Sequence, residues 1–236
     1  MRTIVLGILY AFVLILITPY ILFCMLAGVR DPLIAVGRWA VRAGCRFLGI
    51  WIEIGGLENI EPGTAYVFMP NHLSFLDGPL MAMAVPRPVR IILKKSLFRI
   101  PILGVGMRHV GYVPVDRKGV KGGKKSIERA ARLMRERGYS FLVFPEGTRS
   151  RDGKMRAFRR GGFFLALESG APIVPVSISG TYEIMPRGQW YARGGRVGIV
   201  FREPVASSGY TRETMAGLME AVRKAIAPEE RPAPPG

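Results

Sequence analysis

The chain has 236 residues, of which 49% are hydrophobic, and it contains two cysteines, Cys24 and Cys45. This length suits one catalytic domain with an attachment segment, and the apolar fraction is enough to fill a sizeable core. Both cysteines lie within apolar stretches, which excludes the disulfide framework of a small secreted protein and a C-x-x-C metal site. A catalytic domain in a reducing compartment is the simplest interpretation.

The net charge of +17 is concentrated in the middle of the chain. Residues 86–160 contain 21 Lys or Arg and 5 Asp or Glu, whereas the remaining residues are close to neutral. A field of this sign attracts phosphate groups, anionic lipid surfaces, acidic proteins or nucleic acid. The alternative is a surface that is charged only for solubility, but a block of like charges repels itself and costs stability.

The first predicted element is an apolar helix near the N-terminus. Ile4–Val29 holds 26 consecutive uncharged residues rich in Leu, Ile, Val and Phe, and a spanning helix needs about 20. The run is long for the apolar region of a cleaved signal peptide. Pro19 lies near its middle and predicts a kink, because proline removes a backbone donor.

A second helix is predicted from Pro32 to Trp51. Its arginines Arg38, Arg42 and Arg46 share one face, which is typical of a helix lying in a membrane interface. An amphipathic helix packed on its own domain has the same pattern. The first segment either spans the bilayer or pairs with the second in one leaflet. If it spans, the Arg excess after it places the rest of the chain in the cytoplasm.

Beyond residue 56 the pattern alternates between buried strands and helices. Strands are predicted at Ala65–Met69, Val89–Leu93, Tyr112–Val115, Phe141–Phe144, Ile173–Ser179 and Arg196–Phe201, and helices at Gly123–Gly138, Gly161–Ser169 and Thr211–Ile226. This alternation predicts an α/β fold with a mixed, largely parallel sheet flanked by helices. The chain thus divides into a membrane-attaching helical segment (1–55), an α/β domain (56–227) and a disordered, Pro-rich tail (228–236).

The first polar motif, N-H-L-S-F-L-D at residues 71–77, directly follows a predicted strand, where α/β proteins place their sites. The H-x4-D spacing lets a short turn return Asp77 to His72. A carboxylate bonded to one ring nitrogen fixes the tautomer and leaves the other nitrogen free as a base. The alternative is a turn in which Asn71 and Asp77 only cap backbone groups, which is common for an isolated match.

Two further motifs bring arginine to strand ends. F-P-E-G-T-R-S at residues 144–150 combines a glycine for a tight turn, donors from Thr148 and nearby amides, and the planar fork of Arg149 for a phosphate. The alternative is a turn with a surface Arg149 paired to Glu146. G-Y-V-P-V-D-R at residues 111–117 ends in Arg117 and is uninformative on its own.

Together these motifs supply a base, its orienting acid and two arginine anion clamps. The sequence holds no G-x-S-x-G nucleophile elbow, and neither cysteine lies in a polar motif. Direct attack by a substrate hydroxyl, activated by His72, is therefore favoured over a covalent enzyme intermediate.

In this order, residues 71–77, 144–150 and 172–176 resemble the block motifs of the 1-acylglycerol-3-phosphate acyltransferase (lysophosphatidate acyltransferase) family. The third of these segments reads P-I-V-P-V, and K-K-S-L at residues 94–97 and the segment 111–117 also resemble family blocks. The similarity covers roughly residues 65–180 together with the apolar N-terminus. Several blocks matching in order are specific, whereas any one of them can arise by chance.

The resemblance implies an enzyme that transfers an acyl group from an acyl thioester to the 2-hydroxyl of 1-acylglycerol 3-phosphate, giving phosphatidic acid for phospholipid synthesis. His72 would take the proton from that hydroxyl and Asp77 would orient His72. No metal or other cofactor is implied, since the thiolate is already a good leaving group. Another lysolipid, or glycerol 3-phosphate itself, is the alternative acceptor because such enzymes share these motifs.

The resemblance also implies which residues hold the substrates. The glycerol phosphate would be held by Arg117, Glu146, Gly147, Thr148, Arg149 and Lys94. Within this set Glu146 would position Arg149 or bond a glycerol hydroxyl, and Lys94 would bind either the phosphate or the thioester carbonyl. Pro175, in the third segment, would shape the wall on the acyl side, and apolar residues near 73–83 and 98–105 are expected to line an acyl tunnel.

The expected partners are membrane lipids, lysophosphatidic acid and a donor that is either acyl-CoA or an acyl carrier protein. The basic stretch attracts either donor. The enzyme is expected at the cell (inner) membrane, with its catalytic domain on the cytoplasmic side. Outside the enzyme class, the rival is a basic membrane-anchored protein that binds anionic lipid or nucleic acid without chemistry. The sequence has no aromatic-interleaved RNA motif or zinc finger to support nucleic-acid binding.

Overall fold

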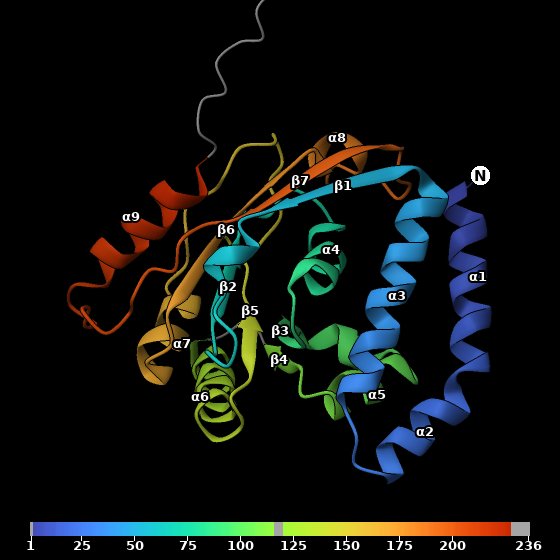
Figure 1. The fold of residues 1–236 in the computed structure, drawn as a ribbon, viewed down its shortest axis with the longest axis horizontal. Coiled ribbons are helices and arrows are strands. Elements are labelled where there is room, and N and C mark those ends of the chain that lie inside the picture. The colour runs from blue at the N-terminus through green and yellow to red at the C-terminus, as the bar shows by residue number, and fades with distance from the viewer. Residues whose placement is uncertain (1, 116–119, 228–236) are drawn as a thin grey trace, which may run out of the picture.

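A mixed sheet of seven strands forms the centre of the molecule (Figure 1). The computed structural model describes residues 2–115 and 120–227, and only the backbone of residues 120–122. The order across the sheet is β1-β7-β6-β2-β5-β3-β4. The strands are β1 (Ile50–Gly55), β2 (Val67–Pro70), β3 (Val89–Lys94), β4 (Val113–Val115), β5 (Ser140–Leu142), β6 (Ile173–Ser179) and β7 (Gly195–Phe201).

Neighbouring strands run parallel except β6 and β7, which are antiparallel. Parallel neighbours need crossover connections, which helices supply here. The helices are α1 (Arg2–Leu16), α2 (Thr18–Leu26), α3 (Asp31–Leu48), α4 (Asp77–Ala84), α5 (Leu103–His109), α6 (Val120–Arg137), α7 (Gly161–Ser169), α8 (Thr181–Ile184) and α9 (Met215–Ile226), with short 3₁₀ turns at Leu57–Asn59 and Lys95–Arg99. The predicted α/β fold with a mixed, largely parallel sheet flanked by helices is confirmed.

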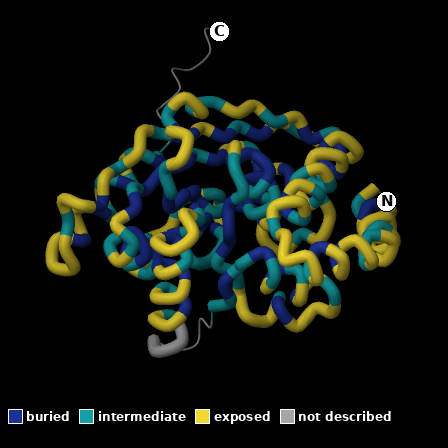
Figure 2. The backbone as a smooth tube through the Cα atoms, turned by 60° about the horizontal axis from the view of Figure 1, so that its bottom comes forward, coloured by how far each residue is buried: buried dark blue, intermediate teal, exposed yellow. Residues whose placement is uncertain are grey.

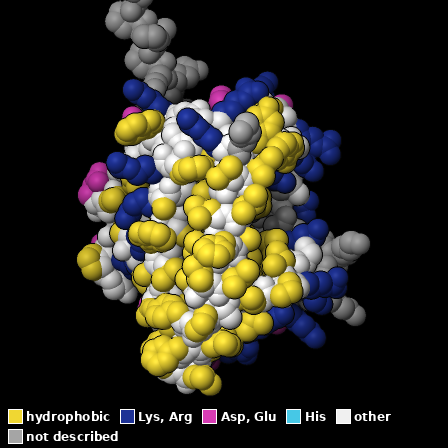
Figure 3. All heavy atoms as spheres, turned by 90° about the vertical axis from the view of Figure 1, so that its right-hand side faces the viewer, with side chains coloured by type: hydrophobic (Ala, Val, Ile, Leu, Met, Phe, Trp, Pro, Cys, Tyr) yellow, Lys and Arg dark blue, Asp and Glu magenta, His cyan; other side chains and the backbone are white. Residues whose placement is uncertain are grey.

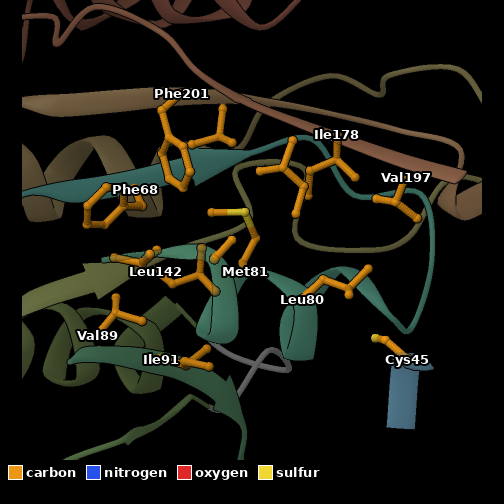
Figure 4. Packing of buried hydrophobic residues seen from close by; sticks show 14 of the residues in the cluster. Cys45, Phe68, Leu80, Met81, Val89, Ile91, Leu142, Ile178, Val197 and Phe201 are labelled. Atoms are coloured by element: carbon orange, nitrogen blue, oxygen red, sulfur yellow. The ribbon is translucent and has the colours of Figure 1, made fainter. Parts of the chain in front are cut away.

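The two faces of the sheet are covered by different helices, and side chains of the central strand β2 alternate between them. Val67 and Met69 pack with α6, α7 and α9 on one face. Phe68 packs with α3 and α4 on the other face. Figure 4 shows this second layer, where Leu80 and Met81 of α4 lie against the sheet residues. Alternation of buried residues on a strand is what a sheet covered on both faces requires.

The predicted apolar helix Ile4–Val29 is bent, as Pro19 indicates. It breaks at Ile17 into α1 and α2, with an angle of 45° between them. Pro19 lies in the first turn of α2 and has no N–H to donate to the preceding turn. Among the described residues no single helix is long and apolar enough to cross a bilayer, whereas α1 and α2 taken together meet that test by length and composition.

One side of the molecule presents a broad apolar surface bordered by Lys and Arg (Figure 3). The tube drawn in Figure 2 is largely exposed around the N-terminus. The exposed apolar side chains of α1 and α2 include Ile4, Val5, Ile8, Leu9, Phe12, Ile15, Leu16, Leu22, Phe23 and Leu26. A contiguous patch of this kind marks an interaction surface rather than the outside of an ordinary soluble domain.

The second predicted helix ends earlier than its sequence pattern suggests. Gly49 has φ +73° and ends α3 at Leu48, because a residue in the left-handed region cannot continue the helix. Residues 50–55, which the sequence places in the N-terminal segment, instead form edge strand β1 and pair in parallel with β7. Ile34 and Leu48 are buried against the domain, while Arg42 and the large apolar Trp39 are exposed, so one face of α3 packs on its own domain and another faces outward.

Several smaller expectations also change. The strand predicted at Phe141–Phe144 spans Ser140–Leu142, and the helix predicted to begin at Thr211 begins at Met215. Thr214 occupies the N-cap, and its Oγ1 accepts a hydrogen bond of 2.8 Å from the N–H of Thr211, which closes a turn before the helix. Helices α4, α5 and α8 were not predicted. The tail expected at 228–236 lies outside the described residues.

Candidate active site

The first two motifs lie side by side because they follow neighbouring parallel strands. Residues 71–77 follow β2, residues 144–150 follow β5, and β2 pairs in parallel with β5. The carboxyl ends of parallel strands lie at one edge of a sheet, where α/β proteins place their sites. A direct bond joins the two loops, since the N–H of Ser150 donates to the carbonyl of His72 at 2.8 Å.

His72 and Asp77 form the pair predicted from the H-x4-D spacing. Nδ1 of His72 lies 2.9 Å from Oδ2 of Asp77. The same oxygen accepts hydrogen bonds from the backbone N–H groups of Leu73 at 2.6 Å and Ser74 at 2.7 Å. A carboxylate can only accept, so Nδ1 carries the proton and Nε2 of a neutral imidazole keeps its lone pair. Both interpretations of this motif apply, because Asp77 orients the imidazole and also caps the backbone N–H groups of the turn.

The imidazole ring of His72 is also held by a stacking contact. The ring of His72 stacks on Phe144, with 3.9 Å between centroids and 24° between planes. Its side chain is 16% exposed, whereas Asp77 is fully buried as the first residue of α4. The positive end of a helix favours a carboxylate at that position. The base is therefore fixed in orientation while it retains an opening to solvent.

Glu146 braces the two loops instead of contacting Arg149. Its Oε1 accepts a hydrogen bond of 2.7 Å from the N–H of His72, and its Oε2 accepts one of 2.8 Å from the N–H of Arg156. Among the described residues no hydrogen bond or ion pair joins Glu146 to Arg149. Burial raises the pKa of Glu146, and the two backbone hydrogen bonds act in the opposite direction. The expectation that Glu146 positions Arg149 has no counterpart in this arrangement.

The remaining residues of the second motif form the surface of the site. Gly147 has φ +70°, the left-handed conformation expected for the tight turn. Thr148 and Arg149 are half-buried, and the Arg149 guanidinium lies 6.0 Å from the ring centroid of Phe75 in the first motif. Arg149 forms no ion pair in the part of the chain that the structure describes. Its charge is therefore open to an anion beside the His72 loop.

The other three predicted site residues lie outside the two motif loops. Lys94 is exposed at the end of β3, in register with Val115 of β4. Pro175 is buried in β6 opposite Met69, and its carbonyl accepts a hydrogen bond of 2.9 Å from the N–H of Arg202. Arg117 lies outside the described residues. Within the described ranges, no three His, Cys, Asp or Glu side chains are grouped as metal ligands are.

A cavity of about 590 Å³ adjoins the second motif. It is mainly apolar, and Phe144 both lines it and stacks on His72. Its other lining residues are Ile92, Val115, Gly123, Lys124, Ile127, Glu128, Val143, Pro145, Gly147, Arg159, Gly161, Gly162, Phe164, Glu168 and Arg212. None of the residues expected to line an acyl tunnel, 73–83 and 98–105, is among them. No local sequence pattern predicts this cavity, because its walls come from elements distant in the chain.

Comparison with known proteins gives a consistent result. The acyltransferase family model matches residues 51–179, which include both motif loops. A 1-acyl-sn-glycerol-3-phosphate acyltransferase from Brassica napus chloroplasts is 35% identical over 158 residues, covering 66% of this chain and 45% of the relative. The enzyme of that name from Borreliella burgdorferi is 33% identical over 144 residues, covering 61% and 57%. The chain spans about half the length of the curated relatives it matches.

A solved structure extends the similarity to the whole fold. The 1-acyl-sn-glycerophosphate acyltransferase PlsC from Thermotoga maritima superposes with a TM-score of 0.76 and 26% identity, covering 98% of this chain and 100% of the other. The likeness therefore includes the N-terminal helices as well as the sheet. With the family match across more than half of its length and the paired motif loops, the chain belongs to the acyltransferase family.

Proposed function

We propose that the protein transfers an acyl group from an acyl thioester to the 2-hydroxyl of 1-acylglycerol 3-phosphate, forming phosphatidic acid. The observation that carries this proposal is the oriented His72–Asp77 pair, whose Nε2 is left as a base. The acceptor and the product are supported by the relatives, which are acyltransferases of 1-acyl-sn-glycerol 3-phosphate. Direct transfer needs no covalent enzyme intermediate.

In the proposed reaction His72 carries one proton from the acceptor hydroxyl to the leaving thiolate. Nε2 of His72 takes the proton of the acceptor hydroxyl as the hydroxyl oxygen attacks the thioester carbonyl. The new C–O ester bond forms, the C–S bond breaks, and the imidazolium returns its proton to the departing thiolate. Asp77 stabilises the imidazolium through the Nδ1 bond. General-base assistance of this kind contributes about 10²–10⁴-fold in rate.

The positive groups around the loop bind the substrate phosphates in this proposal. Arg149 holds the glycerol phosphate with Gly147 and Thr148, and Arg117 and Lys94 are proposed to assist. The adjoining apolar cavity accepts the acyl chain of a substrate. Pro175, which the resemblance assigns to the acyl-side wall, lies in β6 and is not among the described residues that line this cavity. The donor is acyl-CoA or an acyl carrier protein, and no metal or other cofactor takes part.

The proposed setting is the cytoplasmic side of the cell membrane. The exposed apolar side chains of α1 and α2 supply the attachment, and the bordering Lys and Arg match anionic headgroups (Figure 3). This attachment brings the site to the interface in which lysophosphatidic acid resides. No nucleic-acid partner is proposed.

The first test measures thioester-dependent acylation of 1-acylglycerol 3-phosphate by membranes that contain the wild type or His72→Ala. Activity with either donor and its loss in the variant, at equal protein level and membrane binding, are expected. His109→Gln is the control, because Nε2 of His109 forms a hydrogen bond with the carbonyl of Val29 and the residue lies outside the motif loops.

Two results would contradict the proposal. Full activity of His72→Ala would refute the mechanism. A wild type that is inactive with both donors would refute the acceptor, and other lysolipids and glycerol 3-phosphate would then be assayed.

A further inference from the structure

Arg159 lies directly against the second catalytic motif. A Cβ built on Gly147 would lie 2.8 Å from Cδ, 3.0 Å from Nε and 3.6 Å from Cζ of Arg159. The arginine side chain thus occupies the space left by the missing side chain of Gly147. This glycine is needed for two reasons, its left-handed φ of +70° and the close approach of Arg159.

The backbone of this arginine is fixed to the same loop. The N–H of Arg159 donates to the carbonyl of Pro145 at 2.7 Å, and three residues earlier Arg156 donates to Glu146. The Cα of Arg159 is therefore held beside the motif that also braces His72. Because the backbone of Arg159 is already fixed, a ligand that binds the guanidinium has to order only the side chain.

Arg159 differs from the other cations that line the apolar cavity. Among the described residues these cations are Lys124, Arg159 and Arg212, of which Lys124 pairs with Glu128 at 3.8 Å and Arg212 pairs with Glu168. The guanidinium of Arg159 has no hydrogen bond or ion pair within the described ranges. An uncompensated guanidinium at the edge of an apolar cavity suits a ligand with an acyl chain and an anionic group.

We infer that Arg159 is a substrate-binding residue that holds a phosphate group of a substrate while the acyl chain enters the cavity. The inference rests on the proposed acyl transfer and adds a residue that none of the predicted motifs includes. The phosphate belongs either to the glycerolipid acceptor or to the coenzyme A of the donor. Both present the same chemistry, and kinetics separate them.

The test compares Arg159→Gln with Arg160→Gln. Arg160 is the adjacent exposed arginine, but it does not line the cavity, so it matches the change in charge without the contact. Arg159→Gln is expected to raise one KM about 10- to 100-fold, the usual effect of losing a hydrogen bond to a charged group. Arg160→Gln is expected to change either KM less than about twofold, and Arg159→Lys to restore part of the affinity.

The two phosphate sources predict different results. If the acceptor phosphate is bound, the KM for 1-acylglycerol 3-phosphate rises with acyl-CoA and acyl carrier protein alike. If a coenzyme A phosphate is bound, the donor KM rises for acyl-CoA and the KM for 1-acylglycerol 3-phosphate stays unchanged. Equal KM values for Arg159→Gln and Arg160→Gln in all assays would overturn the inference.

A binding measurement keeps this test separate from the proposed reaction. Thermal stabilisation of the wild type and both glutamine variants by glycerol 3-phosphate and by coenzyme A is measured without turnover. Loss of stabilisation in Arg159→Gln alone supports the inference even if the wild type fails to acylate 1-acylglycerol 3-phosphate. Equal stabilisation of all three proteins by both compounds contradicts it.

Discussion

At the scale of single residues, one oxygen atom organises the candidate base. Oδ2 of Asp77 accepts hydrogen bonds from the imidazole of His72 and from two backbone N–H groups. Its partner Oδ1 is buried and has no hydrogen-bond partner in the described part of the chain. Because the backbone bonds fix the orientation of the carboxylate, the tautomer of His72 follows from the geometry of the turn.

Asp77→Asn is expected to lower kcat by about two to four orders of magnitude with little change in KM. An amide oxygen in the place of Oδ2 keeps the three hydrogen bonds, but the neutral amide no longer stabilises the imidazolium. Steady-state kinetics and the melting temperature test this. Asp152→Asn, which keeps the acceptor atom for Ser150 and Lys154, is the control. An unchanged kcat in Asp77→Asn would contradict the assigned role.

The raised pKa of Glu146 makes the stability of the folded protein depend on pH. Burial raises the pKa of its carboxyl above the usual 4.5, so the folded state holds the proton more tightly than the unfolded chain does. Ionisation therefore costs stability as the pH rises from about 4.5 through the folded-state pKa. Glu146→Gln lacks this ionisation. The wild-type melting temperature should fall relative to that of the variant over this window, and parallel curves would contradict the prediction.

At the scale of elements, two adjacent glycines at the start of α7 have different surroundings. A Cβ on Gly161 would meet nothing within 4 Å, whereas one on Gly162 would meet Val143 at 3.0 Å and Met69 at 3.1 Å. Both line the apolar cavity. A larger residue at 161 can therefore fill the cavity without disturbing the sheet, whereas one at 162 presses on its core.

Gly161→Leu is expected to shift the preferred acyl donor to shorter chains and to leave the melting temperature nearly unchanged. Each methylene that the cavity no longer buries costs about 0.8 kcal/mol of binding, or about fourfold in affinity. Assays of kcat/KM over a series of acyl chain lengths measure the shift. Gly162→Ala is the comparison, with a lowered melting temperature from overpacking. An unchanged chain-length profile in Gly161→Leu would exclude the cavity as the acyl site.

The predictability of the elements follows from how local their signals are. The helix Gly161–Ser169 and the strand Ile173–Ser179 have the predicted bounds, because glycine and proline mark their ends and apolar residues fill them. Strand β1 was missed because it directly follows an amphipathic helix, although Gly49 was available as a stop signal. Helix α4 was missed because most of it is buried, so it has no polar face to reveal a helical period.

The site shows the same limit. The pairing of His72 with Asp77 spans five residues, and the spacing alone predicts it. The bond from the His72 N–H to Glu146 spans 74 residues, and it depends on which strands become neighbours in the sheet. The role of Arg159 depends on the same neighbours. Contacts that depend on strand order leave no local sequence pattern. The sequence therefore predicts the catalytic pair but not the residues that hold it in place.

At the scale of the whole molecule, the charge and the apolar surface make separate contributions to membrane binding. The net charge is +17, and the apolar side chains of α1 and α2 are exposed. Attraction by surface charge is screened at high salt, whereas burial of apolar surface is not. A protein held only by charge would leave vesicles as salt is added.

Binding to vesicles that contain anionic lipid is expected to weaken but persist at about 1 M salt, where the Debye length is about 3 Å. Phe12→Asp, on the exposed face of α1, is expected to lower vesicle affinity at least about tenfold, since it removes a large apolar group and adds a charge. Co-sedimentation measures both effects. Thr211→Asp, an equal charge change at an exposed site outside this surface, is the control. Complete release by salt would favour the rival of a purely electrostatic anchor.

The bonds between the two motif loops constrain how the chain can be recombined with its relatives. The N–H of His72 donates to Glu146, and the N–H of Ser150 donates to the carbonyl of His72, so each loop supplies partners for the other. Chimaeras that exchange residues 71–77 and 144–150 together should keep these bonds, whereas exchange of one loop alone risks mismatched partners. The two motif loops are therefore expected to change together among relatives, although they lie far apart in the sequence.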